Sequence, residues 1–162
     1  MTAERPARGW LDRDEQRTWL AYIRLQLRLA YEMNRQLQAE HDLSLPDYDV
    51  LTALSVAPGS SLTVTALATQ IGWERSRLSH HAKRMARRGL VSLDPAPHDR
   101  RVTAVSLTPA GRHTIEAAAP GHVDLVRDLF FDGLPAELRA PFSAALERIY
   151  DNVLARGTLP RP

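Results

Sequence analysis

The spacing of apolar residues predicts a chain made mostly of helices, beginning with one long helix. Apolar positions recur every three or four residues from Asp12 or Asp14 to about His41, which is the period of an amphipathic helix. A helix with apolar residues on two sides needs two partners, so we expect one side to pack in its own domain and the other against a second copy of the chain. The two stripes are Leu20, Ile23, Leu27, Tyr31, Asn34 and Leu37, and Tyr22, Leu25 and Leu29.

A second, shorter helix is expected to start at Ser44 and Pro46, a cap followed by a proline in the first turn. Asp47 and Asp49 then suit the positive end of the helix dipole. The sequence APGS at residues 57–60 ends this helix. Its buried face is predicted to comprise Tyr48, Leu51 and Leu54.

Residues 73–91 form the segment around which the chain is organised. On a helical projection Leu78, Ala82 and Met85 fall on one side, and Gly89 ends the helix because glycine accepts a left-handed backbone. The other side is cationic and carries short hydrogen-bonding groups. Its residues are Ser76, Arg77, Ser79, His80, Lys83, Arg84 and Arg87.

Such a surface has the chemistry that reads a DNA major groove. Arginine and lysine contact phosphates or the O6 and N7 acceptors of guanine, and serine fits either partner. Since most charged helix faces are simply solvated, the neighbouring segments decide between the two interpretations. A short helix with Thr63 as its N-cap precedes the basic helix across a turn at Gly72, which is the order of a helix-turn-helix.

The segment after the basic helix is predicted to be a β-hairpin. Residues 90–93 and 102–107 form its strands, and residues 94–101, rich in proline and aspartate, form its tip. Arg100 and Arg101 lie in this tip. We therefore predict a mostly α fold with a small β-hairpin wing, of the α+β class, in which the wing completes a winged helix-turn-helix.

Helices are expected again after the hairpin. One starts at Thr108-Pro109 and runs to about residue 119, where Pro120-Gly121 kinks or breaks it before a helical pattern resumes over residues 122–131. The predicted organisation is a loose tail and dimerisation helix over 1–41, the winged lobe over 44–107 and dimerisation helices over 108–162. The final helix, over residues 136–155, has the apolar stripe Leu138, Phe142, Leu146, Ile149 and Val153.

Composition adds a segregation of charge. Residues 61–107 hold eight basic and three acidic residues, whereas the rest of the chain holds 13 basic and 16 acidic residues. Positive potential is thus concentrated on the winged lobe, where a polyanion would dock. The hydrophobic fraction of 44% supports a packed core, and the lack of cysteine excludes disulfides and thiolate chemistry. Without an 18-residue apolar run or a signal-peptide pattern, we expect a soluble, cytoplasmic protein with no membrane partner.

The ordered set of segments resembles the MarR family of bacterial transcription regulators over nearly the whole chain. The matching stretches are YDVLTALS, TVTALATQIG, SRLSHHAKRMARRGLV and DRRVTAVSLTPAGR. The spacing from Arg100-Arg101 to Leu107-Thr108 and Gly111 is the most specific of these signals.

The resemblance implies a homodimer whose terminal helices interlock and whose two winged lobes bind half-sites of a pseudo-palindromic operator, with the activity of a repressor. It also implies that small aromatic anions bind between lobe and dimer layer and release the DNA. Asp99 is implied to brace the wing by pairing with an arginine, and Arg100 or Arg101 to enter the minor groove. The reader residues carried over are Ser76, Arg77, Ser79, His80, Lys83 and Arg84.

Four aromatic residues are candidates for an effector pocket, although aromatic residues at helical spacing are more often core. They are Trp19, Tyr22, Tyr48 and Trp73. The sequence identifies neither the effector nor the operator.

Other chemistry has little support. Glu40-His41 with His113 or His122 could form a metal site between helices, but no histidine pair at i, i+4 supports it, so we expect no metal and no cofactor. No glycine-rich phosphate loop, nucleophile elbow or HExxH motif is present, so no enzyme is expected. The alternatives are a metal-responsive member of the same family, or a winged module that binds protein instead of DNA. The concentrated positive charge disfavours the latter, because the centres of protein interfaces are depleted of charge.

Overall fold

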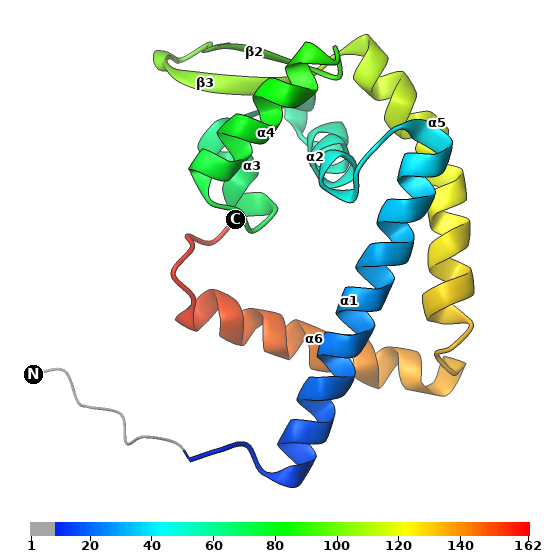
Figure 1. Ribbon diagram of the computed structural model, residues 1–162. Coiled ribbons are helices and arrows are strands. Elements are labelled where there is room, and N and C mark those ends of the chain that lie inside the picture. The colour runs from blue at the N-terminus through cyan, green and yellow to red at the C-terminus, as the bar shows by residue number, and fades with distance from the viewer. Residues whose placement is uncertain (1–8) are drawn as a thin grey trace, which may run out of the picture.

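The computed structural model describes residues 9–162, which form six α-helices and one small antiparallel sheet. Figure 1 shows a lobe of α2, α3, α4 and the β2–β3 hairpin at one end of α1, with α5 running alongside α1 and α6 crossing it near its other end. The predicted mostly α, winged-helix architecture is confirmed. Apart from Gly9, the N-terminal tail predicted to be loose lies outside the described residues.

The elements follow one another in the predicted order. They are α1 (Arg13–His41), α2 (Leu45–Val56), the 3₁₀ turn η1 (Pro58–Ser60), β1 (Ser61–Thr63), α3 (Val64–Gln70), α4 (Arg75–Arg87), β2 (Val91–Ala96), β3 (Asp99–Leu107), α5 (Pro109–Val126), the π-helical turn η2 (Arg127–Phe131) and α6 (Ala136–Arg156). None of the helices within residues 9–162 combines the length and hydrophobicity that a membrane span requires.

Helix α1 begins at a capping box, in which Asp12 and Glu15 each accept the other's main-chain N–H. In its last two turns Gln36 and Leu37 are buried, and Leu37 is fully inaccessible. Farther toward the N-terminus its apolar residues are exposed, and Leu27 retains 68% of its accessible surface. One end of α1 therefore belongs to the core, and the remainder presents hydrophobic surface to solvent.

The core of the lobe lies where α2, α3, α4 and the sheet meet. The face of α4 predicted to be apolar is completely buried, as Leu78, Ala82 and Met85 each have no accessible surface. Burying a side chain of the size of leucine or methionine stabilises a fold by about 1.5–3 kcal/mol, so this face fixes the rotation of α4. The largest fully buried partners from the other elements are Leu51, Leu54, Leu67 and Val105.

Two glycines end the helices of the helix-turn-helix motif, as the sequence predicts. Gly72 (φ 72°) and Gly89 (φ 74°) are both left-handed. After α4, the Gly89 N–H donates to the carbonyl of Ala86 and the Leu90 N–H to that of Met85. These are the two hydrogen bonds of a Schellman motif, and the same pair of bonds follows α3 at Gly72.

The sheet contains a strand that the sequence analysis missed, and its wing has a shorter tip than predicted. The strand order is β1-β3-β2, and β1 pairs with β3 beside a hydrogen bond of 2.7 Å between the hydroxyls of Ser61 and Ser106. In the hairpin, pairing continues to Ala96 and Asp99, so only two residues form the tip, not residues 94–101. Pro95 is accommodated because β2 is an edge strand, where a missing N–H does not interrupt a ladder.

The predicted break at Pro120 is wrong. Helix α5 runs without interruption from Pro109 to Val126, and the irregular part is the π-helical turn that follows. Pro120 is exposed, so the carbonyl that its ring deprives of a partner is within reach of water. Gly121 faces the side chains of Gln36 and Glu40 of α1, and this close packing of α5 on α1 holds the helix together across the proline.

The junction between wing and α5 depends on Thr108 and Gly111. The Thr108 hydroxyl accepts the N–H of Gly111 at 2.9 Å and lies 2.6 Å from the carbonyl oxygen of Gly89. A Cβ on Gly111 would lie 2.0 Å from the carbonyl oxygen of Leu90, which is an impossible approach. Only glycine therefore lets the first turn of α5 rest on the chain that leaves α4.

Replacing Gly111 with alanine should force this junction apart and lower the free energy of unfolding by about 1–3 kcal/mol, the usual effect of overpacking. Gly133→Ala is the matched control, because a Cβ there would meet its nearest atom at 3.7 Å. Its effect should stay within about 0.5 kcal/mol. Thermal unfolding followed by circular dichroism compares the two variants, and equal melting temperatures would contradict the role given to Gly111.

Candidate nucleic-acid interface

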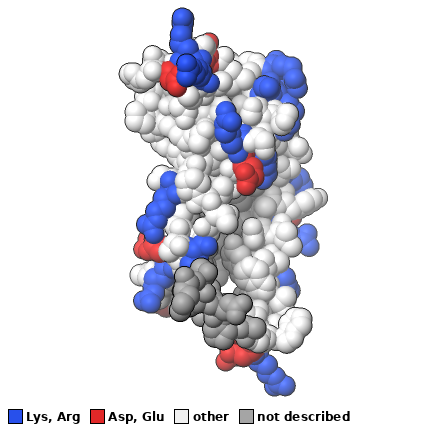
Figure 2. All heavy atoms as spheres, turned by 90° about the vertical axis from the view of Figure 1, so that its left-hand side faces the viewer, with Lys and Arg blue, Asp and Glu red and all other residues white. Residues whose placement is uncertain are grey.

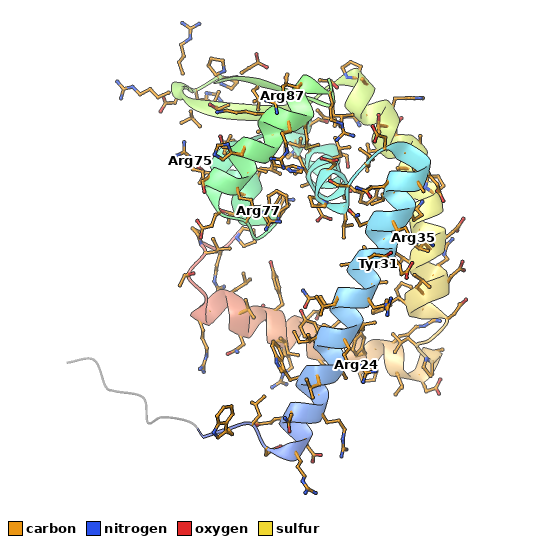
Figure 3. All side chains as sticks on the ribbon, in the orientation of Figure 1. Arg24, Tyr31, Arg35, Arg75, Arg77 and Arg87 are labelled. Atoms are coloured by element: carbon orange, nitrogen blue, oxygen red, sulfur yellow. The ribbon has the colours of Figure 1, made fainter. Side chains whose placement is uncertain are left out.

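Helix α4 presents the residues predicted to read DNA on its outer surface. Since Leu78, Ala82 and Met85 are buried, the opposite side faces solvent. Figure 3 shows Arg75 and Arg77 near the start of α4 and Arg87 near its end, close to the wing. Of the predicted residues Ser79 is half-buried, and the exposed ones are Ser76, Arg77, His80, Lys83, Arg84 and Arg87.

The wing brings a second group of arginines to the same lobe. Arg100 and Arg101 are exposed at the start of β3, directly after the tip. The Asp99 carboxylate accepts the main-chain N–H of Arg101 at 2.9 Å. Within residues 9–162 it forms no ion pair with a guanidinium, so the expected pairing with an arginine side chain is replaced by a bond to the backbone. Both residues belong to β3, so this bond orders the start of that strand and does not connect it to β2.

Basic side chains gather on this lobe. In Figure 2 the wing and α4 occupy the upper half of the molecule, and Lys and Arg side chains project from it in several directions. These cations stand on a short helix and a neighbouring hairpin, so a polyanion could contact several of them at once.

Arg77 has a defined orientation in the free protein. Its guanidinium lies over the indole ring of Trp73, 4.0 Å from the ring centroid. Trp73 is itself buried and meets the His81 ring edge-on, with centroids 5.3 Å apart. A cation–π contact at a partly exposed site contributes about 0.5–1 kcal/mol, enough to favour one position of a long side chain.

Beneath α4 lies a buried polar cluster that the sequence analysis missed. Asp47, assigned from sequence only to the helix dipole, lies 2.9 Å from Nε2 of His81 and 2.7 Å from Nη1 of Arg88. It also accepts the main-chain N–H of Ser44 at 2.9 Å. Burial alone raises the pKa of Asp47, but His81, Ser44 and Arg88 together outweigh this and hold the pKa far below its usual range. The carboxylate thus pins α4 to α2 in its ionised form.

Arg88 completes the cluster at the end of α4. Besides Asp47 it contacts the main-chain carbonyl and the carboxylate of Asp42, the left-handed residue that ends α1. No sequence motif marks these three residues as neighbours, since Asp47 and Arg88 are 41 positions apart.

The four aromatic residues proposed for an effector pocket are not brought together within the chain. Trp19 and Tyr22 contact each other on the exposed part of α1, with ring centroids 5.7 Å apart. Trp73 belongs to the lobe, as described above. Of the four, only Tyr48 lines a groove, of about 460 Å³ between α2, α3 and α5. There the His122 ring packs against it, with ring centroids 4.3 Å apart and the ring planes tilted by 40°.

His122, which the sequence analysis considered only as a metal ligand, is therefore part of the groove. Burial lowers its pKa, and its Nδ1 has no hydrogen-bond partner in the described part of the chain. No group of three His, Asp or Glu side chains suited to a metal ion occurs within residues 9–162.

The ionised state of Asp47 leads to a prediction about the free energy of unfolding and its dependence on pH. Asp47→Asn should lower the free energy of unfolding by roughly 1.5–3 kcal/mol at neutral pH, the range of a hydrogen bond to a charged group. Because the pKa of Asp47 is lower in the folded than in the unfolded chain, its stabilisation is complete above the unfolded value of about 3.9 and is lost as the pH falls below it. Urea unfolding from pH 7 to pH 3 should therefore show the two proteins converging in acid.

The control for this experiment is Asp124→Asn, which removes an exposed ion pair with Arg127. It should change stability by less than about 1 kcal/mol at any pH. A difference between the wild type and Asp47→Asn that persists undiminished at pH 3 would show that Asp47 is not the ionised partner.

Comparison with known proteins identifies the family to which this winged lobe and its flanking helices belong. A family model described as MarR family matches residues 41–102. The HTH-type transcriptional repressor IacR of Pseudomonas putida is 31% identical over 138 residues, which are 83% of this chain and 77% of that protein. Two MarR family regulators of Streptomyces coelicolor have similar structures. AbsC is 32% identical with a TM-score of 0.85, over 92% of this chain and 100% of its own. Sco3205, solved in complex with DNA, is 33% identical with a TM-score of 0.87, over 97% of this chain and 99% of its own. The chain belongs to the MarR family of transcriptional regulators.

Proposed function

We propose that this regulator is a sequence-specific repressor that binds double-stranded DNA as a homodimer and is released by a small aromatic ligand. The observation that carries the proposal is the row of arginine, lysine and serine side chains on α4, directly opposite a fully buried face. None of these side chains is needed to fill the core, so all of them are available to a ligand. DNA binding by the relative Sco3205 and the repressor activity of IacR support the same conclusion.

In the proposed complex α4 lies in the major groove and the wing follows the minor groove. Arg77, near the start of α4, is suited to a bidentate contact with guanine, whereas Arg100 and Arg101 contact phosphates or the minor groove. The other residues assigned to the recognition helix are Ser76, Ser79, His80, Lys83, Arg84 and Arg87. A protein-binding role is less well supported, because the centre of this surface is charged.

The apolar surface that the chain leaves uncovered supports a homodimer. Helix α6 has no buried residue, and Ile149 and Val153 on it are 60% and 56% exposed. Leu27 on α1 is similarly exposed, and Figure 3 shows that Tyr31 lies along the same helix. Such a run of exposed hydrophobic residues marks an interaction site, and interlocked terminal helices of two copies, the proposed dimer layers of residues 1–41 and 108–162, would cover it.

The groove beside Tyr48 is the proposed effector site. Burial raises the pKa of the Tyr48 hydroxyl and lowers that of the His122 imidazole, so both are neutral at pH 7. Asp49 is the single charged residue lining this groove, and it is acidic. The groove therefore suits an uncharged aromatic ligand with hydroxyl or amide groups better than the aromatic anions that the family resemblance implied.

Contacts to bases and contacts to phosphates can be distinguished, because only the loss of a base contact should affect operator DNA far more than random DNA. Arg77→Ala should lower operator affinity by roughly 1–3 kcal/mol while changing affinity for random DNA far less. Arg100→Ala and Arg101→Ala should weaken all sequences more evenly and reduce the slope of log K against log salt by about one unit for each phosphate that is no longer neutralised. Fluorescence anisotropy with an operator selected from genomic fragments measures both quantities.

The matched control is Arg35→Ala, which removes the same charge from an exposed position on α1 (Figure 3). It should leave the specificity ratio unchanged. If Arg77→Ala preserved that ratio while a wing variant abolished it, the roles of reader and anchor would be reversed.

Light scattering tests the dimer. The purified protein should have twice the chain mass of 18.1 kDa at micromolar concentration. Val153→Glu should produce aggregate or unfolded chain, because it places a charge in the proposed interface, whereas Arg148→Glu on the same helix is the control for an added acid. A folded, stable monomer of the wild type would refute the proposed architecture.

Ligand binding can be monitored by tryptophan fluorescence against a panel of phenols, indoles and benzoates. An uncharged phenol or indole that binds should weaken operator binding, and by linkage the operator should weaken ligand binding by the same factor. Tyr48→Phe should reduce both effects, while Tyr22→Phe, outside the groove, should not. Coupling that survives Tyr48→Phe unchanged would locate the effector elsewhere.

A further inference from the structure

His81 is the buried residue of α4 that connects the core of the lobe to a DNA-facing arginine. Only 7% of its surface is exposed, although the residue before it is exposed to solvent. Its Nε2 lies 2.9 Å from the Asp47 carboxylate of α2, and its Nδ1 lies 2.8 Å from Nη2 of Arg84, one helical turn later.

The contact with Arg84 determines the tautomer of the neutral imidazole ring. A guanidinium has five N–H donors and no acceptor, so Nδ1 must offer its lone pair to Arg84. In the neutral ring the proton is then on Nε2, on the side of the ionised Asp47. The Nε2–carboxylate contact is short but not straight enough for a good hydrogen bond, so the assignment rests on Arg84.

Arg84 keeps most of its donors while it is held in this way. One N–H of its fork is directed to His81, and the rest of the exposed guanidinium faces solvent on the surface assigned to DNA. A free arginine side chain loses rotamer freedom when it binds, and a contact already made in the unbound protein reduces that loss.

We propose that His81, which lies between Asp47 and Arg84, is a positioning residue for DNA recognition that orients Arg84 for the duplex without touching the DNA itself. Asp47 is anchored independently by Ser44 and Arg88, so it remains fixed when DNA binds. This inference rests on the proposed DNA-binding function, and it adds a core residue, His81, to the determinants of operator affinity.

Two substitutions at His81 distinguish positioning from packing. His81→Phe keeps an aromatic ring beside Trp73, and so keeps the platform under Arg77, but removes the acceptor for Arg84. His81→Asn loses the ring but places an amide oxygen near the position of Nδ1. Operator affinity should fall roughly tenfold in His81→Phe, the equivalent of the side-chain entropy of one arginine, and should be largely retained in His81→Asn.

The decisive test is to make His81→Phe in a protein that already carries Arg84→Ala. If His81 acts through Arg84, His81→Phe should have no further effect on operator affinity once Arg84 is alanine. Additive losses, or equal losses in the Phe and Asn variants, would overturn the proposal. Operator binding unaffected by Arg84→Ala would also overturn it, while leaving the proposed function on Arg77 and the wing.

A spectroscopic measurement needs no variant and no DNA. Long-range ¹H–¹⁵N correlation spectra of the wild-type protein at neutral pH should show His81 with an unprotonated Nδ1 and a protonated Nε2. The opposite tautomer, or a ring protonated at both nitrogens, would overturn the inference even if DNA binding is confirmed.

Discussion

The burial of one face of α4 is the constraint on which the rest of the lobe depends. Leu78, Ala82 and Met85 are completely removed from solvent, and this determines which residues of the helix can reach a ligand. Asp47 adds a directional restraint, because a buried carboxylate must keep its partners, whereas hydrophobic packing alone tolerates a small rotation or shift. Contacts inside the protein thus determine which side chains form the surface proposed to read DNA.

The elements that the sequence predicted well are those whose signals are local. The periodicity of α4, the glycines at 72 and 89 and the caps at Ser44 and Thr108 each act within a few residues, and the structure has them all in place. The exposure of most of the α4 residues that we propose as DNA readers followed from the same periodicity, because a helix that buries one face must expose the other. The dimer, the effector and the individual DNA contacts involve molecules other than this chain and remain proposals.

The features that the sequence did not reveal depend on contacts between distant segments. The short strand β1 exists only through pairing with β3, and α5 continues past Pro120 because α1 packs against Gly121. In the sequence His81 is simply one of two adjacent histidines, and Asp47 is a residue of a helix start. Their proximity follows from how the fold of the lobe places α2 relative to α4, which no periodicity encodes.

Helix α2 connects the proposed effector groove to the recognition helix. Asp47 and Tyr48 are consecutive, yet one contacts His81 of α4 and the other packs against His122 of α5. On a helix, neighbouring residues point about 100° apart, so a single rigid element holds both contacts at once. A ligand that enters beside Tyr48 and displaces α2 would therefore move the carboxylate beneath α4. Because that carboxylate is buried and ionised, it cannot lose its partners without a large penalty, so α4 would move with it. This geometry supplies a direct physical link between the groove and the arginines proposed to contact DNA, and the proposed release from DNA needs no longer pathway.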